Sequence, residues 1–347
     1  MSDQPSHVEA PNAPRVHIRD VARAAGVSHT TVSRVLNDHP SVIRETRQRV
    51  LDSIRQLNYR PSSTARALAT GRSLTFGVII FDATQYGPAA TLNGIGAAAR
   101  EAGYSINVAV LRSSADGSAQ DAIDRLAGQG VDGIIVIASE MSVARTVADT
   151  RHRVPMVGLN DSFDVKVPAV KVDESGGGRQ ATQYLLQLGH ATVWHIAGPT
   201  DSISAAGRVA GWMSALQTAR APVPTNLIGD WTAASGYRRG LELARLPEVT
   251  AIFAANDQMA LGVLHALYEV GRRVPEDVSV VGFDDVPEAA YYQPALSSVR
   301  PDFAEVGRQC VAVMLEQIDH RPLSKERFVT PTELVVRRSS GPPPAQG

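Results

Sequence analysis

Residues 18–37 read IRDVARAAGVSHTTVSRVLN and contain two short helical patterns separated by a turn. In the first pattern Val21, Ala22 and Ala25 fall on one helix face, and a glycine follows the last of them. Ser28 is well placed to cap the second helix, because its hydroxyl can accept hydrogen bonds from free backbone N–H groups. Two such helices predict a helix-turn-helix, whose second helix can enter the major groove of DNA.

The polar side chains of the second helix lie largely opposite its valines and leucine. Arg34 can donate two hydrogen bonds to a guanine, and His29 and Thr30 can reach base edges. Serine and threonine hydroxyls nearby can hold phosphates. A third helical pattern, over about residues 44–57, supplies a further apolar face. The segment therefore predicts a small all-helical domain with one face suited to DNA.

Charge is distributed unevenly along the chain. Residues 15–73 contain eleven arginines and four acidic residues, a net charge of +7. The other residues contain 23 basic and 31 acidic side chains, a net charge of −8. A basic block joined to an acidic body is typical of a nucleic-acid-binding module fused to another domain. A solvated helix surface could carry the same charge, so the motif is needed to support this interpretation.

Length and composition exclude several classes of protein. The 347 residues suggest two or three domains. No apolar run is long enough for a transmembrane helix, and the N-terminus lacks the apolar segment of a secretory signal. The single cysteine, Cys310, excludes an internal disulfide framework and a cysteine-rich metal site, and it fits a reducing cytoplasm. We expect a cytoplasmic protein without a metal or a cofactor.

From Leu74 onward, short apolar runs alternate with helical patterns. Examples of these runs are TFGVIIF at 75–81, GIIVIA at 133–138, TAIFAAN at 250–256 and VSVVGFDD at 278–285. This alternation predicts parallel sheets built from β-α-β units. The strands are too many for one small sheet, so we expect an α/β body of two doubly wound parallel-sheet subdomains of periplasmic-binding-protein type. Ligands of such sheets bind at the carboxyl ends of strands.

These patterns divide the chain into five parts. The expected parts are a disordered arm at 1–14, a helix-turn-helix domain at 15–60, a hinge at 61–73, a body at 74–338 and a disordered tail at 339–347. Within the body, one subdomain is expected to combine residues 74–172 with 303–330, and the other residues 173–302 with 331–338.

Two segments of the first 73 residues resemble the lactose-repressor (LacI/GalR) family of transcription regulators. They are DVARAAGVSHTTVSRVLN at 20–37 and TRQRVLDSIRQLNYRPSSTARALATGRS at 46–73, and the resemblance continues to about residue 338. It implies that His29, Thr30 and Arg34 read bases. The residues that it places near phosphates are Ser28, Thr31, Ser33, Asn37 and Thr46. His17 and Ile43 stand where a hydroxyl residue often caps a helix, so this chain departs from the family there.

The hinge has helix signals of its own. Ser62 can start a helix and Gly71 can end it, but so short a helix is unstable alone in water. We expect it to form only beside its dimer mate on DNA. The resemblance implies that Leu68 wedges into the minor groove, and that Ser62 and Ala65 also contact DNA. The alternative is a plain linker with one buried leucine.

Polar residues at strand ends are the candidates for an effector site. The run GPTDSISAAGRVAGW at 198–212 resembles the family's loop after a strand, which implies that Arg208 bonds sugar hydroxyls. Trp231 matches an aromatic on which a sugar ring stacks, and Asn160 stands where an aspartate is common. The complete expected set is Asn160, Ser204, Arg208, Trp231, Asn256 and Asp284. Together these residues suit a neutral polyol.

Each of these residues also has an ordinary interpretation. Arg208 could be a surface cation and Trp231 a core residue. Asp257 is interpreted first as the cap of the helix that follows it, because it directly precedes the helical run QMALG. For Arg208 and Asp284 the family match favours a ligand role.

An enzyme and a transport protein are the two rival classes. Gly94 and Gly96 fit a nucleotide-binding fingerprint, but they fall within a helical pattern and not in the turn after a strand, so close helix packing explains them better. A solute-binding transport protein would share the body's architecture, yet it would not need a helix-turn-helix. We therefore expect a regulator and not an enzyme.

The combined expectation is a homodimeric transcription repressor that binds double-stranded operator DNA. A sugar would release it from the operator, and the candidate ligands favour a galactoside or a related oligosaccharide. A corepressor that tightens DNA binding remains the alternative. No leucine heptad follows Leu334, so no tetramerising tail is expected.

Overall fold

The computed structural model describes residues 16–36, 39–59, 71–111, 118–138, 154–160, 167–323 and 327–345. The chain forms two compact units, residues 1–73 and 74–347. The expected arm at 1–14 and most of the hinge at 61–73 lie outside the described residues. None of the described helices is sufficiently long and apolar to cross a membrane.

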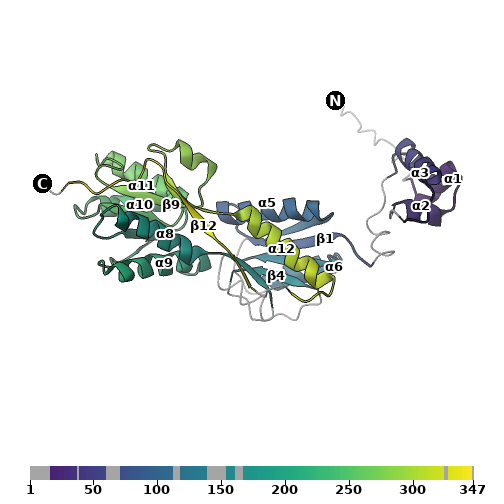
Figure 1. Ribbon diagram of the computed structural model, residues 1–347, viewed down its shortest axis with the longest axis horizontal. Helices are drawn as coiled ribbons and strands as arrows, with labels where there is room; N and C mark the ends of the chain where they lie inside the picture. The colour runs from purple at the N-terminus through teal and green to yellow at the C-terminus, as the bar shows by residue number, and fades with distance from the viewer. Residues whose placement is uncertain are drawn as a thin grey trace, which may run out of the picture. The chain divides into compact units, whose positions relative to one another are not determined.

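The described residues of the first unit form three helices that pack together (Figure 1). They are α1 (Ile18–Ala25), α2 (His29–Leu36) and α3 (Arg44–Gln56). Val21, Val32 and Val50 contribute one fully buried residue from each helix. The hydroxyl of Ser28 accepts from the N–H of Thr31 at 3.2 Å, which confirms the predicted cap of α2.

The second unit contains two six-stranded sheets, which confirms the predicted fold class. The first sheet is wholly parallel, in the order β11-β5-β4-β3-β1-β2. Its strands are β1 (Thr75–Phe81), β2 (Ser105–Leu111), β3 (Gly133–Ile137), β4 (Met156–Leu159), β5 (Ala169–Val172) and β11 (Arg327–Thr330). We call this sheet and its helices the N-terminal subdomain.

Helices cover both faces of this sheet. On one face pack α5 (Tyr86–Glu101) and α12 (Phe303–Ile318), which lie side by side in Figure 1. On the other face packs α6 (Ser118–Gly128). The fingerprint residue Gly94 lies inside α5, where a Cβ atom would be 2.5 Å from the backbone oxygen of Phe303. Close packing of α5 on α12 therefore explains this glycine, as predicted.

The second sheet has the order β12-β10-β9-β8-β6-β7, and only the pair β10–β12 is antiparallel. Its strands are β6 (Trp194–Ala197), β7 (Leu227–Ile228), β8 (Ala251–Ala254), β9 (Ser279–Phe283), β10 (Ser297–Pro301) and β12 (Thr332–Val335). A 3-10 helix, η1 (Pro287–Tyr291), lies between β9 and β10. This sheet and its helices form the C-terminal subdomain.

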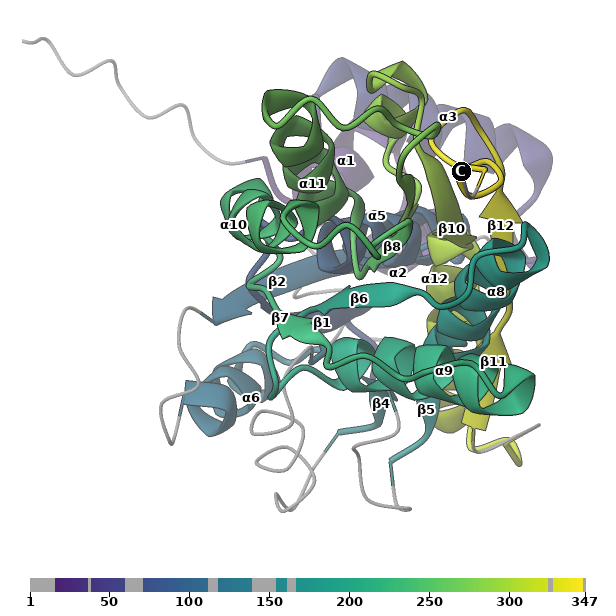
Figure 2. The same cartoon turned by 90° about the vertical axis from the view of Figure 1, so that its left-hand side faces the viewer.

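Two pairs of helices cover this sheet (Figure 2). The pair α8 (Glu174–Gln187) and α9 (Ile203–Ala219) packs on one face. The pair α10 (Ala233–Ala244) and α11 (Asp257–Glu269) packs on the other. The described chain passes between the two sheets three times, after β5, after β10 and after β11.

The prediction of a disordered tail over residues 339–347 is wrong for the first residues of that segment. Ser339 is fully buried, and its hydroxyl accepts from the N–H of Ser297 at 2.8 Å and donates to the carbonyl of Val280 at 2.6 Å. The carbonyl of Gly341 accepts from the ring of His190 at 3.0 Å. A polar composition is typical of a disordered tail, so the sequence did not indicate that this segment is ordered. Here the polar hydroxyl of Ser339 forms hydrogen bonds with backbone groups of the sheet.

Candidate functional site

A cavity of about 240 Å³ lies between the two subdomains of the body. Ends of strands from both sheets surround it, at the positions expected for a ligand of a parallel sheet. The structure brings all six predicted effector residues to its wall. They are Asn160, Ser204, Arg208, Trp231, Asn256 and Asp284.

Arg208 lies in the second turn of α9, and its side chain is only 6% exposed. Its Nε donates to a carboxylate oxygen of Glu174 at 2.7 Å, and its Nη2 to Asp284 at 3.4 Å. Nη1 donates to the carbonyl of Ala255. The guanidinium also stacks on the ring of Phe283, with 3.7 Å between Cζ and the ring centroid. A surface-cation interpretation of Arg208 is therefore excluded.

Glu174 is a lining residue of the cavity that the sequence analysis did not include. It is the first residue of α8, directly after the strand β5 and the N-cap Asp173, and it lines the cavity. Its side chain is 13% exposed. A carboxylate that directly follows the run VPAVKVD was a usable signal, since ligands of parallel sheets bind at strand ends.

Asp284 follows the end of β9 in a left-handed backbone conformation, with a φ of 95°. Its side chain is 7% exposed. Burial raises the pKa of this carboxyl to about 6; the charge of Arg208 opposes the rise and that of Glu174 adds to it. Asp284 is therefore an acceptor whose protonation state is sensitive to its neighbours near neutral pH.

The cap of α11 is Asn256 and not Asp257. Asn256 caps α11, because its side-chain oxygen accepts from the N–H of Met259 at 2.9 Å. Asp257 is fully buried and accepts from the N–H of Val286 at 2.8 Å and the hydroxyl of Ser298 at 2.6 Å. The predicted cap role of Asp257 is wrong. Its carboxylate fixes the loop after β9, on which Asp284 stands.

Trp231 and Asn160 occupy left-handed positions on opposite sides of the cleft, with φ of 71° and 76°. Trp231 is half-buried, and its carbonyl accepts from the amide of Asn256 at 3.0 Å. The amide of Asn160 donates to the carbonyl of Ala138 at 3.0 Å, which leaves its oxygen to accept. Ser204 is half-buried at the start of α9.

Most of the apolar side chains of the cavity wall come from the N-terminal subdomain. Among them are Phe81, Leu159 and Phe303. Two apolar residues also cross the cleft in opposite directions. Tyr86 of α5 packs against the core of the C-terminal subdomain, and Ile203 of α9 packs against the core of the N-terminal subdomain. The body therefore has a site lined by charged and polar groups, most of them from the C-terminal subdomain, and by apolar groups, most of them from the N-terminal subdomain.

The buried histidine of strand β6 does not belong to this cavity. His195 is stacked on Phe253, with 4.6 Å between ring centroids, and its Nδ1 donates to the carbonyl of Phe253 at 2.8 Å. Burial lowers the pKa of its imidazole to about 4. Among the described residues, no cluster of three or more side chains could hold a metal ion.

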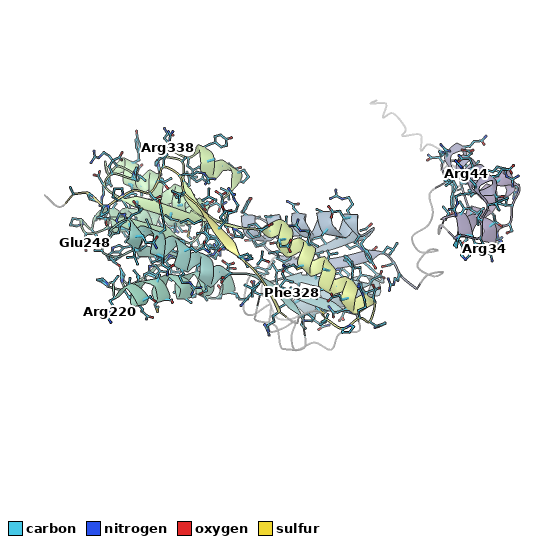
Figure 3. The ribbon with its side chains drawn as sticks, in the orientation of Figure 1. Arg34, Arg44, Arg220, Glu248, Phe328 and Arg338 are labelled. Carbon is cyan, nitrogen blue, oxygen red and sulfur yellow. The ribbon has the colours of Figure 1, made fainter. Side chains whose placement is uncertain are left out.

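The helical unit presents the predicted DNA-binding face on α2. Four of the predicted DNA-binding residues are exposed to solvent: Ser28, His29, Thr30 and Arg34. Figure 3 shows Arg34 at the surface of the unit. Thr31, Ser33 and Thr46 complete the described part of the predicted set. The remaining predicted DNA contacts, Asn37, Ser62, Ala65 and Leu68, lie outside the described residues.

Comparison with known proteins agrees with this arrangement. Residues 17–62 match the family model of bacterial regulatory proteins, lacI family, and residues 182–340 match that of the periplasmic binding protein-like domain. The lactose operon repressor of Escherichia coli (strain K12) is 33% identical over 335 residues, which are 95% of this chain and 92% of that protein.

Two solved structures extend the comparison. The lac repressor dimer bound to operator and the anti-inducer ONPF has a TM-score of 0.83 at 32% identity, over 94% of this chain and 99% of that chain. A complex of the transcriptional regulator CelR with cellobiose has a TM-score of 0.69 at 33% identity, over 94% of this chain and 100% of that chain. The chain therefore belongs to the lacI family of bacterial regulatory proteins.

Proposed function

We propose that this protein is a homodimeric repressor of transcription that a sugar, bound in the cleft of the body, releases from operator DNA. It acts as a regulator and not as an enzyme. One observation carries the proposal. Arg208, Asp284 and Trp231 meet in a cleft between two subdomains of a chain that also carries a helix-turn-helix. Paired donors and acceptors beside an aromatic plate are suited to a sugar ring.

The relatives support both halves of the proposal. One similar structure is a dimer on operator DNA, and another holds cellobiose. In the proposed complex each α2 reads one half-site of a pseudo-palindrome, and the half-sites are about one helical turn apart. The arginines of the first unit neutralise phosphates, so affinity for DNA falls steeply as salt rises.

Release is a matter of linkage between two sites. A sugar that favours one arrangement of the two subdomains displaces the DNA only if it binds the DNA-free form more tightly than the DNA-bound form. Tyr86 and Ile203 each pack against the core of the opposite subdomain, so they contribute to the arrangement of the two subdomains. In the proposed mechanism closure shifts the dimer interface and separates the two hinge segments.

The experiment combines DNA selection with a sugar titration. A pool of random DNA is selected on the full-length protein, and the enriched duplex is then used in mobility-shift assays with cellobiose and lactose as probes. At least one sugar is expected to release the wild-type protein, while Arg208→Ala binds the duplex but ignores the sugar. Calorimetry that shows unchanged sugar affinity in Arg208→Ala would refute the site. Tighter DNA binding with sugar would make the ligand a corepressor.

A further inference from the structure

The guanidinium of Arg208 is held between two carboxylates that come from different elements of the C-terminal subdomain. Glu174 begins α8 and Asp284 follows β9, and both side chains are largely buried. With both carboxylates ionised, the three side chains together carry a net charge of −1. The positive charge of Arg208 is therefore already paired within the protein and does not require an anionic ligand.

The rest of the cavity wall adds to this negative balance. Asp82, Asp201 and Asp230 also line the cavity, whereas Arg208 is the one cation among the described lining residues. Asp230 interacts with Arg238 at 3.4 Å on the exposed side of the loop. The field in the cleft therefore disfavours a phosphate or carboxylate group.

The position of the Glu174 side chain depends on Gly207 of the neighbouring helix α9. A Cβ atom on Gly207 of α9 would stand 2.7 Å from the Cβ of Glu174, so the glycine leaves the room through which this side chain reaches Arg208. The first turn of α8 also suits a carboxylate, because the free N–H groups of a helix N-terminus favour negative charge. The ion pair is therefore built into the packing of α8 on α9.

We propose that Glu174 is a specificity-determining residue, which restricts the effector to uncharged glycosides and rejects phosphorylated or carboxylated sugars. The inference rests on the proposed function, since it concerns the ligand of the same cleft. Hydroxyl groups of an uncharged sugar can donate to the carboxylates and accept from the guanidinium at once. An anionic group can only accept, and it must approach Glu174 and Asp284 to reach Arg208.

The test is a charge series at constant shape in the full-length protein. Wild type, Glu174→Gln and the double variant Glu174→Gln/Asp284→Asn carry −1, 0 and +1 at the centre of the site. Calorimetry measures binding of cellobiose, lactose, glucose 6-phosphate and inorganic phosphate to each. We expect wild type to bind neither anion, and affinity for glucose 6-phosphate to rise about tenfold at each step.

Two further variants separate charge from geometry and from folding. Glu174→Asp keeps the charge but shortens the side chain, so it is expected to exclude anions as wild type does. Glu248→Gln removes the same charge from an exposed residue that does not line the cavity, labelled in Figure 3, and is expected to leave every affinity unchanged. Retained DNA binding and an unchanged melting temperature show that a variant is folded.

The outcomes distinguish this inference from the proposed function. Wild-type binding of glucose 6-phosphate as tightly as of an uncharged sugar overturns the inference but leaves a sugar-responsive repressor. An anion affinity that does not change along the charge series overturns it as well. Sugars that fail to bind at all, together with a rise in anion affinity in Glu174→Gln, would support Glu174 as the charge filter while refuting the proposed sugar response.

Discussion

Gly178 of α8 lies directly against the backbone carbonyl of Arg208 on α9, so that a Cβ atom at position 178 would overlap the carbonyl oxygen. The contact brings the two helices close enough for the side chains of Glu174 and Arg208 to meet. Gly178→Ala is expected to force α8 and α9 apart, with a cost of about 1–3 kcal/mol in the free energy of unfolding.

Sugar affinity in Gly178→Ala is expected to fall as well, because Arg208 moves with its helix. Gly128→Ala is the matched control: Gly128 ends α6, and a Cβ atom added there would meet no other atom within 4 Å. This control is expected to match or slightly exceed wild-type stability. Urea denaturation and calorimetry would measure both effects, and equal stability of the two alanine variants would contradict the packing argument.

Protonation of Asp284 is expected to stabilise the body as pH falls. Its pKa is about 6 in the folded protein and near 3.8 in an unfolded chain, so between these values the folded state binds a proton that the unfolded state lacks. The stability of wild type relative to Asp284→Asn therefore rises as pH is lowered from about 7 to about 4. Thermal unfolding at a series of pH values tests this, and parallel curves for the two proteins would show that Asp284 does not titrate there.

His195 is expected to act in the opposite direction over almost the same range. Its folded pKa is about 4 and its ordinary value is 6.5, so the unfolded state takes up a proton first and stability is lost as pH falls from 6.5 towards 4. The loss is on the order of 3 kcal/mol. His195→Phe keeps the stack on Phe253 and removes the titration.

The phenylalanine variant is expected to resemble wild type at about pH 7 and to exceed it in stability at about pH 5. Any loss of stability at neutral pH comes in part from the carbonyl of Phe253, which loses its hydrogen bond from the imidazole of His195. A wild-type protein that loses no more stability than His195→Phe on acidification would show that the fold does not lower the pKa of the imidazole.

Ser339 is expected to contribute to stability although it lies near the end of the chain. Removal of its hydroxyl in Ser339→Ala leaves the N–H of Ser297 buried without this partner, at a cost of about 1–3 kcal/mol. Ser340→Ala is the control, because Ser340 is only half-buried and its hydroxyl contacts other hydroxyl groups. Chemical denaturation that ranks Ser340→Ala as the more costly change would refute the role of Ser339.

Arg34→Ala is expected to relax sequence preference at one position of each half-site. A bidentate contact to guanine contributes about 1–3 kcal/mol of discrimination, so single-base variants at that position should come to bind equally. Arg23→Ala removes the same charge from α1, where the side chain of Arg23 is 82% exposed. This variant is expected to lower the affinity for all DNA sequences by the same factor. A uniform loss for Arg34→Ala as well would make Arg34 a phosphate contact.

Local patterns predicted much of this protein because their physical causes are local. The spacing of Val21 and Ala25 along one helix face, and the hydroxyl of Ser28 before α2, specify a helix and its start within a few residues. The strands β3, β8 and β9 are buried at every position, and a short unbroken apolar run is typical of such a strand. Placement of candidate ligands at strand ends followed from the same alternation.

Local sequence patterns do not predict contacts between residues that are far apart along the chain. Glu174 and Arg208 are 34 residues apart, and nothing near either one specifies the other. Asp257 precedes a helical run and so resembles a cap, yet its partners Val286 and Ser298 lie on another strand and loop. Gly178 belongs to a run of three glycines, and nothing in that run shows that it permits α8 to approach α9.

Local sequence patterns by themselves determined the helix-turn-helix and the alternation of strands and helices, whereas six residues of the cleft were expected from the resemblance to a family. Backbone hydrogen bonding and the burial of apolar faces act over short stretches, so these features could be read along the chain. Only the tertiary structure decided which polar groups became partners, since a buried charge must be paired with whatever the fold brings beside it. Glu174 therefore pairs with Arg208, and in the same way the buried hydroxyl of Ser339 bonds to backbone groups of the second sheet.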